Sequence, residues 1–551
     1  MPEIPVGELD IVTSSTTPQR LFADRVSSCG ITWTFEKEHE IGFFVDGSPW
    51  VKGPVKIIDI DPPTRRMNYP GSTIEVDING TVIDPKAYTD YQGWDELAGM
   101  AAGHQTNQPS YFASIHYPTD THAPHNLGFN GNAGLYLPLT IDGDNRGTSV
   151  VSCESHNIIE GHSEKSESRI KRVGILTVYP TDQTVLTGSN SGAMSGVAYP
   201  DTNDFRPPYS KPQANSAPYV FNLTGCLEDK LHRSGLFVTP TGIPNITGLA
   251  SSFSCIRLES AMVGQRNSPG VVYNTTNRHL LYNTAQTYSD GRDIANAIGQ
   301  AALIYHASGS LGTDLGVSGW DVKDPAFRDL KIGVVQRGID TLGICEQLMS
   351  GGAGGGGTAT YQPSVPFGAM YGPMSNQGRL FELLFAGYLL SGNHANGAGE
   401  RLYNASSGFM WQEDQQTFEI DAYTPFIGQN YTTGMTGLKE WGVKHSGAPH
   451  LDNADFASPS QFESERASTV GSWWAQTLGA RVCQMYPRAL GGPVWNDDDY
   501  FGYMERHQGF STGVTTRQVS GDGGFGAAIT DRDMTWNTWS KHMWDKHRTD
   551  H

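Results

Sequence analysis

Hydrophobic and polar positions alternate along residues 31–60, which is the pattern of antiparallel strands. Ile31, Trp33 and Phe35 are separated by threonines, and this period of two places their side chains on one face of a strand. An Asp-Gly pair at residues 46–47 marks a turn, after which apolar residues resume. We therefore expect two or three antiparallel strands in this segment.

The strand pattern continues beyond this segment. Residues 72–78 and 81–83 form a second candidate pair, joined by Asn-Gly at 79–80, a strong hairpin signal. Runs at 135–151 and 170–178 repeat the pattern. The β-rich character thus extends to about residue 260.

The hydrophobic period changes to that of helices near residue 285. Asp324 and Pro325 predict a cap followed by a first helical residue, and Ser460 with Glu463 forms a capping box. Helices are expected at six places: from Asp290, from Pro325 toward Met349, at Leu380–Leu390, after Ser460 as far as Pro487, at Asp497–His507 and at Met534–His547.

The run Leu380–Leu390 is apolar on every face except at Glu382, which indicates a helix inside a large core. A glycine-rich segment and then a polar segment dense in carboxylates, amides and aromatic rings follow it. This arrangement is typical of a polar cleft mounted on a helical scaffold.

These patterns predict an α+β multidomain chain. We expect a β-rich, sandwich-like N-terminal domain at 1–145, a β-rich and loop-rich middle region at 146–280, and a helical domain at 281–551. The helical domain fits either a bundle or part of an α/α toroid, because both produce the same periodicities.

The charge balance limits the partners. The chain has 38 basic and 57 acidic residues, a net charge of -19, which repels phosphate backbones and anionic lipid surfaces. The sequence contains no run of about 18 apolar residues that could span a membrane. We expect neither nucleic-acid binding nor membrane insertion.

The localisation expected from the sequence is a virion or the extracellular space. The 65 glycines, 23 tyrosines and a charged fraction of only 17% are typical of loop-rich surface proteins. The first 15 residues show no secretory signal, and the retained Met1 argues against trimming. Six scattered cysteines without a CxxC pair predict buried free thiols rather than a zinc knuckle or a dense disulfide framework.

Several blocks carry a resemblance: ITWTF with WVKGPV, FRPPY, VVQRGIDTLG, LFELLFAGYLL, EDQQTF, PVWNDDDYFGYMER and HMWDKHR. In these blocks and their order, from about residue 30 to 548, the chain resembles a set of uncharacterised proteins from environmental, largely marine, bacteria. The resemblance implies a β-rich N-terminal part and a helical C-terminal part. By analogy with toroid-like polysaccharide lyases and hydrolases it also implies glycan handling, here in a phage-borne form.

Glycoside hydrolysis needs one protonated and one ionised carboxyl group. Glu413, Asp414 and Asp421 could supply such a pair. Glu382, between apolar neighbours, could have the raised pKa that a catalytic acid requires. The alternative is that Glu382 pairs with Arg379 and that the others are solvated loop acids.

Cleavage of a polysaccharide by β-elimination needs a base, a proton donor for the leaving oxygen and a group that neutralises the uronate. His445, Tyr431 and Arg379 fit these roles, with Asn430 or Gln429 as the neutralising group. A strongly acidic protein suits an anionic polymer only if its cleft is locally basic, and an ordinary loop histidine is the alternative for His445.

A divalent metal is the one cofactor that the sequence suggests. His116, Asp120, His122 and His125 are close enough for one loop to gather them around an ion. A polar surface loop is the alternative. The sequence has no P-loop, no GxSxG motif and no HExxH helix, so it gives no support to a P-loop nucleotide site, a serine hydrolase or a metalloprotease.

Aromatic side chains suggest a sugar-binding surface. Rings in connections between helices commonly stack on sugar faces, with core packing as the alternative. The candidates are Trp411, Tyr423, Tyr431, Trp441, Trp495 and Tyr500.

The function expected from the sequence is glycan recognition by a phage tail or fibre protein, with polysaccharide cleavage as an additional activity. The alternatives are a stand-alone polysaccharide lyase or glycoside hydrolase and a purely structural virion protein. The expected partners are a bacterial surface glycan, other virion proteins and further copies of the same chain.

Overall fold

The computed structural model describes about two fifths of the chain, in two compact units. The units comprise residues 1–162 with 168–224, and 163–167 with 225–551. The described residues are 21–61, 65–66, 75–77, 82–83, 138–143, 147–155, 169–181, 200, 202–208, 221–226, 244–254, 256–259, 290–307, 325–349, 378–391, 399–406, 411, 413, 417–420, 436–441, 471–486, 495–511 and 538–549.

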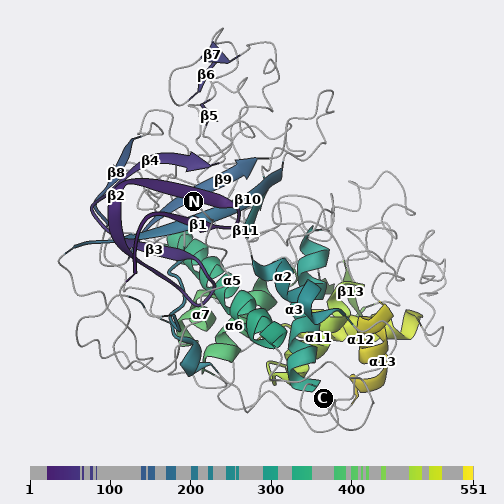
Figure 1. Ribbon diagram of the computed structural model, residues 1–551. Helices are drawn as coiled ribbons and strands as arrows, with labels where there is room; N and C mark the ends of the chain where they lie inside the picture. Colours follow the sequence, from purple (N-terminus) through teal and green to yellow (C-terminus); the bar gives the residue numbers. More distant parts are fainter. Residues whose placement is uncertain are drawn as a thin grey trace. The chain divides into compact units, whose positions relative to one another are not determined.

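The first unit is built on a curled, mixed sheet (Figure 1). Its strands are β1 (Leu21–Ser28), β2 (Ile31–Phe43), β3 (Pro49–Lys52), β4 (Val55–Asp61), β8 (Leu139–Ile141), β9 (Thr148–Ser155) and β10 (Arg169–Tyr179). The long strand β2 pairs antiparallel with β1, β3 and β4. Strand β8 extends the sheet from β4, while β10 runs parallel to β3 and antiparallel to β9.

The alternation read from the sequence sets the core of this sheet. Ile31, Trp33 and Phe35 are buried, and the threonines between them are partly exposed. Gly47 forms the predicted turn with a φ of 81°, a value that favours glycine. Asp46 closes this turn by accepting a hydrogen bond from the Ser48 backbone N–H at 3.0 Å. The expectation of antiparallel strands in this segment is therefore confirmed.

A smaller antiparallel sheet contains β5 (Arg65–Arg66), β6 (Glu75–Asp77) and β7 (Val82–Ile83). The pairing of β6 with β7 confirms the predicted strand pair, while the Asn-Gly turn between them lies outside the described residues. The 3₁₀ turn η3 (Leu223–Gly225) completes the short elements before the helical part.

The cysteines are of two kinds. Cys226 and Cys483 are buried and form no disulfide, as expected. Cys29 is disulfide-bonded, so the expectation of a free thiol is wrong at this position. Spacing alone missed this bond because a disulfide depends on which Cα atoms the fold brings close together.

The second unit is mainly helical. Its helices are α2 (Ile246–Ser254), α3 (Asp290–Ala307), α5 (Pro325–Met349), α6 (Arg379–Ser391), α7 (Glu400–Ser406), α11 (Trp473–Val482), α12 (Asp498–Ser511) and α13 (Thr538–His547). Three short strands, β11 (Ile256–Glu259), β12 (Thr417–Glu419) and β13 (Lys439–Trp441), belong to the same unit, and β12 pairs antiparallel with β13. The chain is thus an α+β protein with strands first and helices later.

Most of the helices begin near the positions that the sequence predicts. Helix α5 starts at Pro325, where the missing N–H of proline costs nothing. The described part of α11 starts at Trp473, and Ser460 and Glu463 lie outside the described residues. Helices α2 and α7 were not anticipated. Both are shorter than three turns, so their hydrophobic period is hard to recognise.

Small residues bring the main helices close together. Helix α5 packs against α6 and α2, and α3 packs against α11 (Figure 1). A Cβ atom on Gly338 of α5 would lie 2.1 Å from the Cβ of Ala386 on α6. A Cβ on Gly299 of α3 would meet the backbone N of Gln476 on α11 at 2.3 Å. These two helix pairs therefore require glycine at their crossing points.

Replacing Gly338 with alanine should separate α5 from α6 and lower the free energy of unfolding by about 2 kcal/mol, the usual cost of overpacking. The matched control is Gly248→Ala in α2, where the nearest atom to an added Cβ is 3.7 Å away. That change should raise stability by about 0.5 kcal/mol, because alanine reduces the freedom of the unfolded chain. Chemical denaturation measures both. Equal effects at the two positions would refute the close packing of α5 on α6.

Candidate functional site

The candidate site is a buried polar network that begins at Glu382, in the middle of the apolar helix α6. Its carboxylate lies 3.2 Å from Arg337 Nε and accepts a hydrogen bond from Thr341 Oγ1 at 2.8 Å. Arg379 Nη1, one turn earlier on α6, lies 3.8 Å away. All four side chains are buried. The sequence suggested the partner Arg379, and Arg337 and Thr341 of α5 are additional partners.

This ion pair is expensive to bury and costly to break. Moving two charges out of water costs several kcal/mol per ion, and their attraction offsets this only when further hydrogen bonds satisfy the groups. Thr341 supplies one such bond, and the Arg337 guanidinium also lies 5.8 Å from the centre of the Phe253 ring. The network therefore fixes the register of α5 against α6.

Glu413 is the second carboxyl group of the network. Its Oε1 accepts a hydrogen bond from the Gly378 backbone N–H, immediately before α6. Complete burial raises the pKa of Glu413 to about 7, although hydrogen bonds and the charge of Arg379 act in the opposite direction. Arg379 thus interacts with both carboxyl groups, one ion-paired and the other neutral below about pH 7.

Helices α11 and α12 continue the network. Gln476 hydrogen-bonds with the Glu413 carboxyl and donates from Nε2 to the Tyr500 hydroxyl at 2.8 Å. Thr477 Oγ1 lies 2.9 Å from the same hydroxyl. The Tyr500 ring stacks on Trp495 with centroids 4.5 Å apart. Polar groups from α6, α11 and α12 therefore meet in the interior of the helical unit.

The three candidate sugar-stacking rings whose side chains are described lie in the interior. Trp411, Trp495 and Tyr500 are at most 2% exposed, and Trp411 Nε1 donates to the Ser406 carbonyl at 2.8 Å. Their exposed fractions agree with the alternative of core packing. For Trp411 and Trp495, position in a connection was a poor guide, because a connection can cross the interior when its polar groups find partners there. Tyr500 lies in helix α12 and not in a connection.

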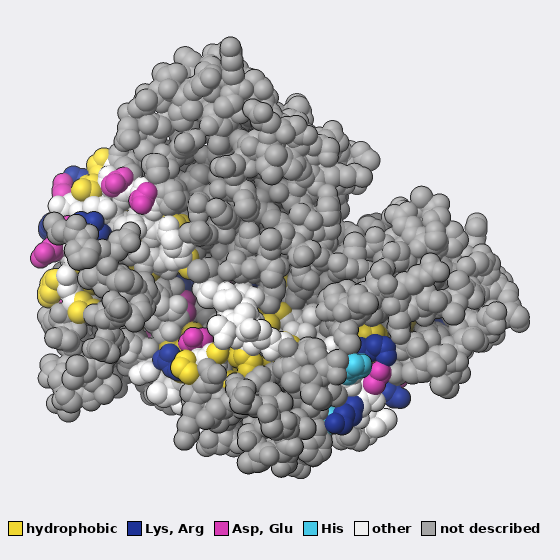
Figure 2. Space-filling view, turned by 45° about the vertical axis from the view of Figure 1, so that its right-hand side comes forward, with side chains coloured by type: hydrophobic (Ala, Val, Ile, Leu, Met, Phe, Trp, Pro, Cys, Tyr) yellow, Lys and Arg dark blue, Asp and Glu magenta, His cyan; other side chains and the backbone are white. Residues whose placement is uncertain are grey.

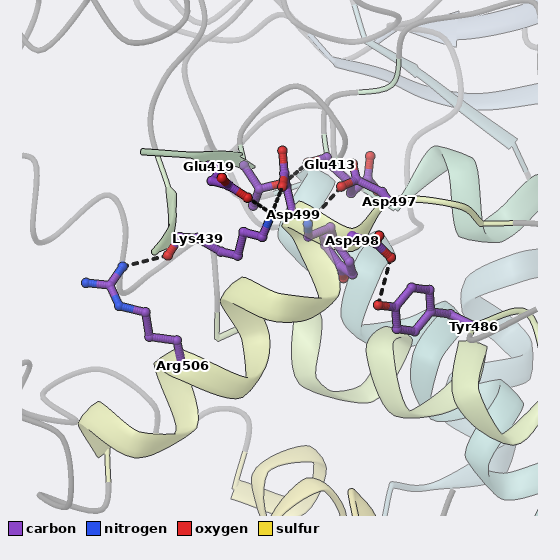
Figure 3. A network of polar contacts seen from close by, with 10 residues as sticks. Glu413, Glu419, Lys439, Tyr486, Asp497, Asp498, Asp499 and Arg506 are labelled. Carbon is purple, nitrogen blue, oxygen red and sulfur yellow. Dashed lines mark hydrogen bonds and ion pairs between the residues drawn. The ribbon is translucent and has the colours of Figure 1, made fainter. Parts of the chain in front are cut away.

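A second polar cluster is accessible to solvent and joins the β12–β13 hairpin to α12 (Figure 3). Lys439 Nζ lies 2.6 Å from both Glu419 Oε2 and Asp499 Oδ1. Partial burial lowers the pKa of Lys439, but the hydrogen bonds to these carboxylates outweigh it, so the pKa is raised above its ordinary value. Arg506 Nη1 also donates to the Lys439 carbonyl at 2.6 Å.

The charge on the described surface is mixed. Figure 2 shows acidic and basic side chains side by side on the face in view, rather than one large patch of a single sign. The surface cluster of Lys439, Glu419 and Asp499 has the same mixed character. An anionic polymer would therefore find no continuous basic surface among the described residues of this face.

The remaining candidates lie outside the described residues. They are the catalytic candidates Asp414, Asp421, Tyr431 and His445, the binding candidates Tyr423 and Asn430, the alternative neutralising residue Gln429, and the metal candidates His116, Asp120, His122 and His125. Trp441 lies in β13, and its side chain is also outside the description. Of the proposed catalytic and binding residues, the structure brings Glu382, Glu413, Arg379 and Tyr500 into one network.

Two further properties concern the described residues alone. They contain no group of three or more histidine, cysteine or acidic side chains placed to hold a metal ion. In the same part of the chain, no helix combines the length and apolar character needed to cross a membrane.

Comparison with known proteins gives no match to a family model, a curated protein or a solved structure. The chemistry of the residues is therefore the basis for any functional proposal.

Replacing Glu382 with glutamine should lower the free energy of unfolding by about 3 kcal/mol, because it leaves two guanidinium groups buried without their carboxylate. The control is Asp545→Asn on α13, which removes an exposed ion pair with Lys541 (2.6 Å) and should cost less than about 1 kcal/mol. Denaturant titration compares the two. A Glu382→Gln variant as stable as the control would show that the ion pair does not hold α5 and α6 together.

Proposed function

We propose that the chain recognises a bacterial surface glycan as a component of a phage virion. In this proposal a β-sandwich-like N-terminal part and a helical bundle or α/α toroid form the framework. The observation that carries the proposal is the solvent-accessible cluster in which Lys439 holds Glu419 and Asp499 side by side.

The chemistry of this cluster suits the hydroxyl groups of a sugar. Each carboxylate has two oxygens with about four lone-pair sites in total. Lys439 donates a hydrogen bond to one oxygen of each carboxylate. The other oxygens, Glu419 Oε1 and Asp499 Oδ2, can accept hydrogen bonds from sugar hydroxyls. The side chains of Glu419 and Asp499 are 52% and 35% exposed, and the ammonium group holds them in fixed positions.

Two further observations support the proposed place of the protein in a virion. The disulfide at Cys29 is typical of proteins that work in an oxidising environment, including virion surfaces. The net charge of -19 disfavours nucleic acid as a partner. The proposed partners are the glycan, other virion proteins and further copies of the chain, and a purely structural virion protein is the alternative without glycan binding.

Polysaccharide cleavage is a second candidate function, favoured by one specific observation. Burial raises the pKa of Glu413 to about 7, while Glu382, which also lies near Arg379, is ion-paired with Arg337. A glycosidase needs such a pair of carboxyl groups in different protonation states. Both carboxyl groups are buried, so cleavage requires that the protein opens to admit the end of the polysaccharide. A stand-alone hydrolase or lyase is the corresponding alternative to the virion setting.

The binding proposal predicts that the double variant Glu419→Gln with Asp499→Asn loses affinity for host surface polysaccharide by at least about tenfold, equivalent to about 1.4 kcal/mol. The physical reason is that the amides bind Lys439 and sugar hydroxyls less strongly than carboxylates do. Affinity electrophoresis or biolayer interferometry measures the change, with Asp545→Asn as the control that keeps full affinity. Wild-type affinity in the double variant would refute this binding site.

The cleavage proposal predicts new reducing ends when the protein is incubated with the same polysaccharide, and unsaturated ends if the reaction is an elimination. Glu413→Gln should lower product release by at least about 100-fold, the usual effect of losing a general acid. Wild-type activity should also fall as the pH rises above about 7, where Glu413 loses its proton. Retained binding with no released product would rule out cleavage.

A further inference from the structure

The surface cluster of Glu419, Lys439 and Asp499 already holds one ammonium group between two carboxylates. Lys439 Nζ lies 2.6 Å from Glu419 Oε2 and 2.6 Å from Asp499 Oδ1. The stem of Lys439 lies against α12, since a Cβ added to Gly502 would be 2.9 Å from Lys439 Cγ. Carboxylates from β12 and α12 thus converge on a single cation.

The cations of the cluster are engaged within the protein. Lys439 donates hydrogen bonds to both carboxylates, and Arg506 Nη1 donates to the Lys439 carbonyl at 2.6 Å. An anionic group on a ligand would have to displace one of these bonds, and the two carboxylates would repel it at close range. The cluster is therefore poorly suited to a uronate, sulfate or phosphate group.

Neighbouring carboxylates add to the negative charge. Asp497 and Asp498 directly precede Asp499, and Figure 3 shows Asp498 between Lys439 and Tyr486. The Tyr486 hydroxyl donates a hydrogen bond to Asp498 at 3.0 Å. Acidic side chains therefore outnumber basic ones around the cluster, which favours a ligand that carries positive charge.

We propose that the glycan recognised at this cluster carries free amino groups, as an unacetylated hexosamine does. The protonated amine of such a sugar is the same chemical group as the Lys439 ammonium. Glu419 Oε1 and Asp499 Oδ2, the oxygens that Lys439 does not use, accept its hydrogen bonds, and its charge makes these bonds stronger than those of a neutral hydroxyl. The inference rests on the proposed glycan binding and names the class of glycan.

The first test compares three short oligosaccharides by isothermal titration calorimetry of the full chain. The probes are a glucosamine oligomer, its N-acetylated form and a uronate oligomer of the same length, at about pH 6, where amines are protonated and exposed carboxylates are ionised. An exposed ion pair strengthens an interaction by up to about fivefold. The glucosamine oligomer should therefore bind about fivefold more tightly than the acetylated form, and the uronate oligomer should bind most weakly.

Salt dependence shows the sign of the charge interaction. Raising the ionic strength from about 0.01 M to about 0.15 M shortens the screening length from about 30 Å to about 8 Å. This change should weaken binding of the glucosamine oligomer and leave the acetylated form almost unaffected. Tighter binding of the acetylated or the uronate oligomer would overturn the inference.

Host surface polysaccharide separates failure of this inference from failure of the proposed function. If the protein binds that polysaccharide but shows no preference for the glucosamine oligomer, the inference fails and glycan binding stands. If it binds neither the polysaccharide nor any of the oligomers, both fail.

A matched pair of variants separates the cluster from the charge of the whole protein, because a net charge of -19 attracts cations to any part of the surface. Glu419→Gln with Asp499→Asn should abolish the preference for the glucosamine oligomer. Asp59→Asn with Asp61→Asn removes two exposed carboxylates from β4 and should keep the preference. An equal loss in the two double variants would show non-specific attraction and overturn the inference.

A further variant, Lys439→Met, determines which group the ligand meets. Removing the ammonium leaves Glu419 and Asp499 without their shared cation, so the glucosamine oligomer should bind at least about twofold more tightly as its amine replaces the lost group. If Lys439 itself binds the glycan, the same variant loses affinity and the inference fails. The wild-type ranking of the three oligomers decides the matter if the variant does not fold.

Discussion

A carboxylate inside an apolar helix is the constraint on which the helical unit depends. Glu382 is completely buried, and its charge is tolerated because Arg337 and Arg379 face it and Thr341 donates a hydrogen bond. Apolar packing alone would permit several registers of α5 on α6, since hydrophobic contact is not directional. A buried charge with fixed partners allows one register, because any other register leaves charges unpaired.

The interior network and the surface cluster differ in what they can do. The network of Glu382, Glu413 and Gln476 has its polar atoms covered by helices, so its direct effect is on stability and on how that stability depends on pH. The side chains of Glu419 and Asp499 in the surface cluster are 52% and 35% exposed. The proposed glycan binding is placed at the surface cluster because binding there needs no opening of the core.

The predictions that succeeded depend on residues that are close to one another in the sequence. The buried alternation at Ile31, Trp33 and Phe35, the start of α5 at Pro325 and the complete burial of α6 follow from local periods and caps. The burial of Trp411 and Trp495 could not be predicted in this way, because a connection between helices has no hydrophobic period that shows which side faces solvent. The short strand β12, three residues long, also lacked a readable period.

Local sequence patterns were enough to predict the order of strands and helices and the need to neutralise Glu382, because these depend on neighbouring residues and on the cost of a buried charge. Tertiary structure alone decided which groups meet that need. Arg337 is 45 residues from Glu382, and no local pattern links them. The raised pKa of Glu413 and the disulfide at Cys29 likewise depend on the fold, because burial and proximity arise only when distant segments pack together.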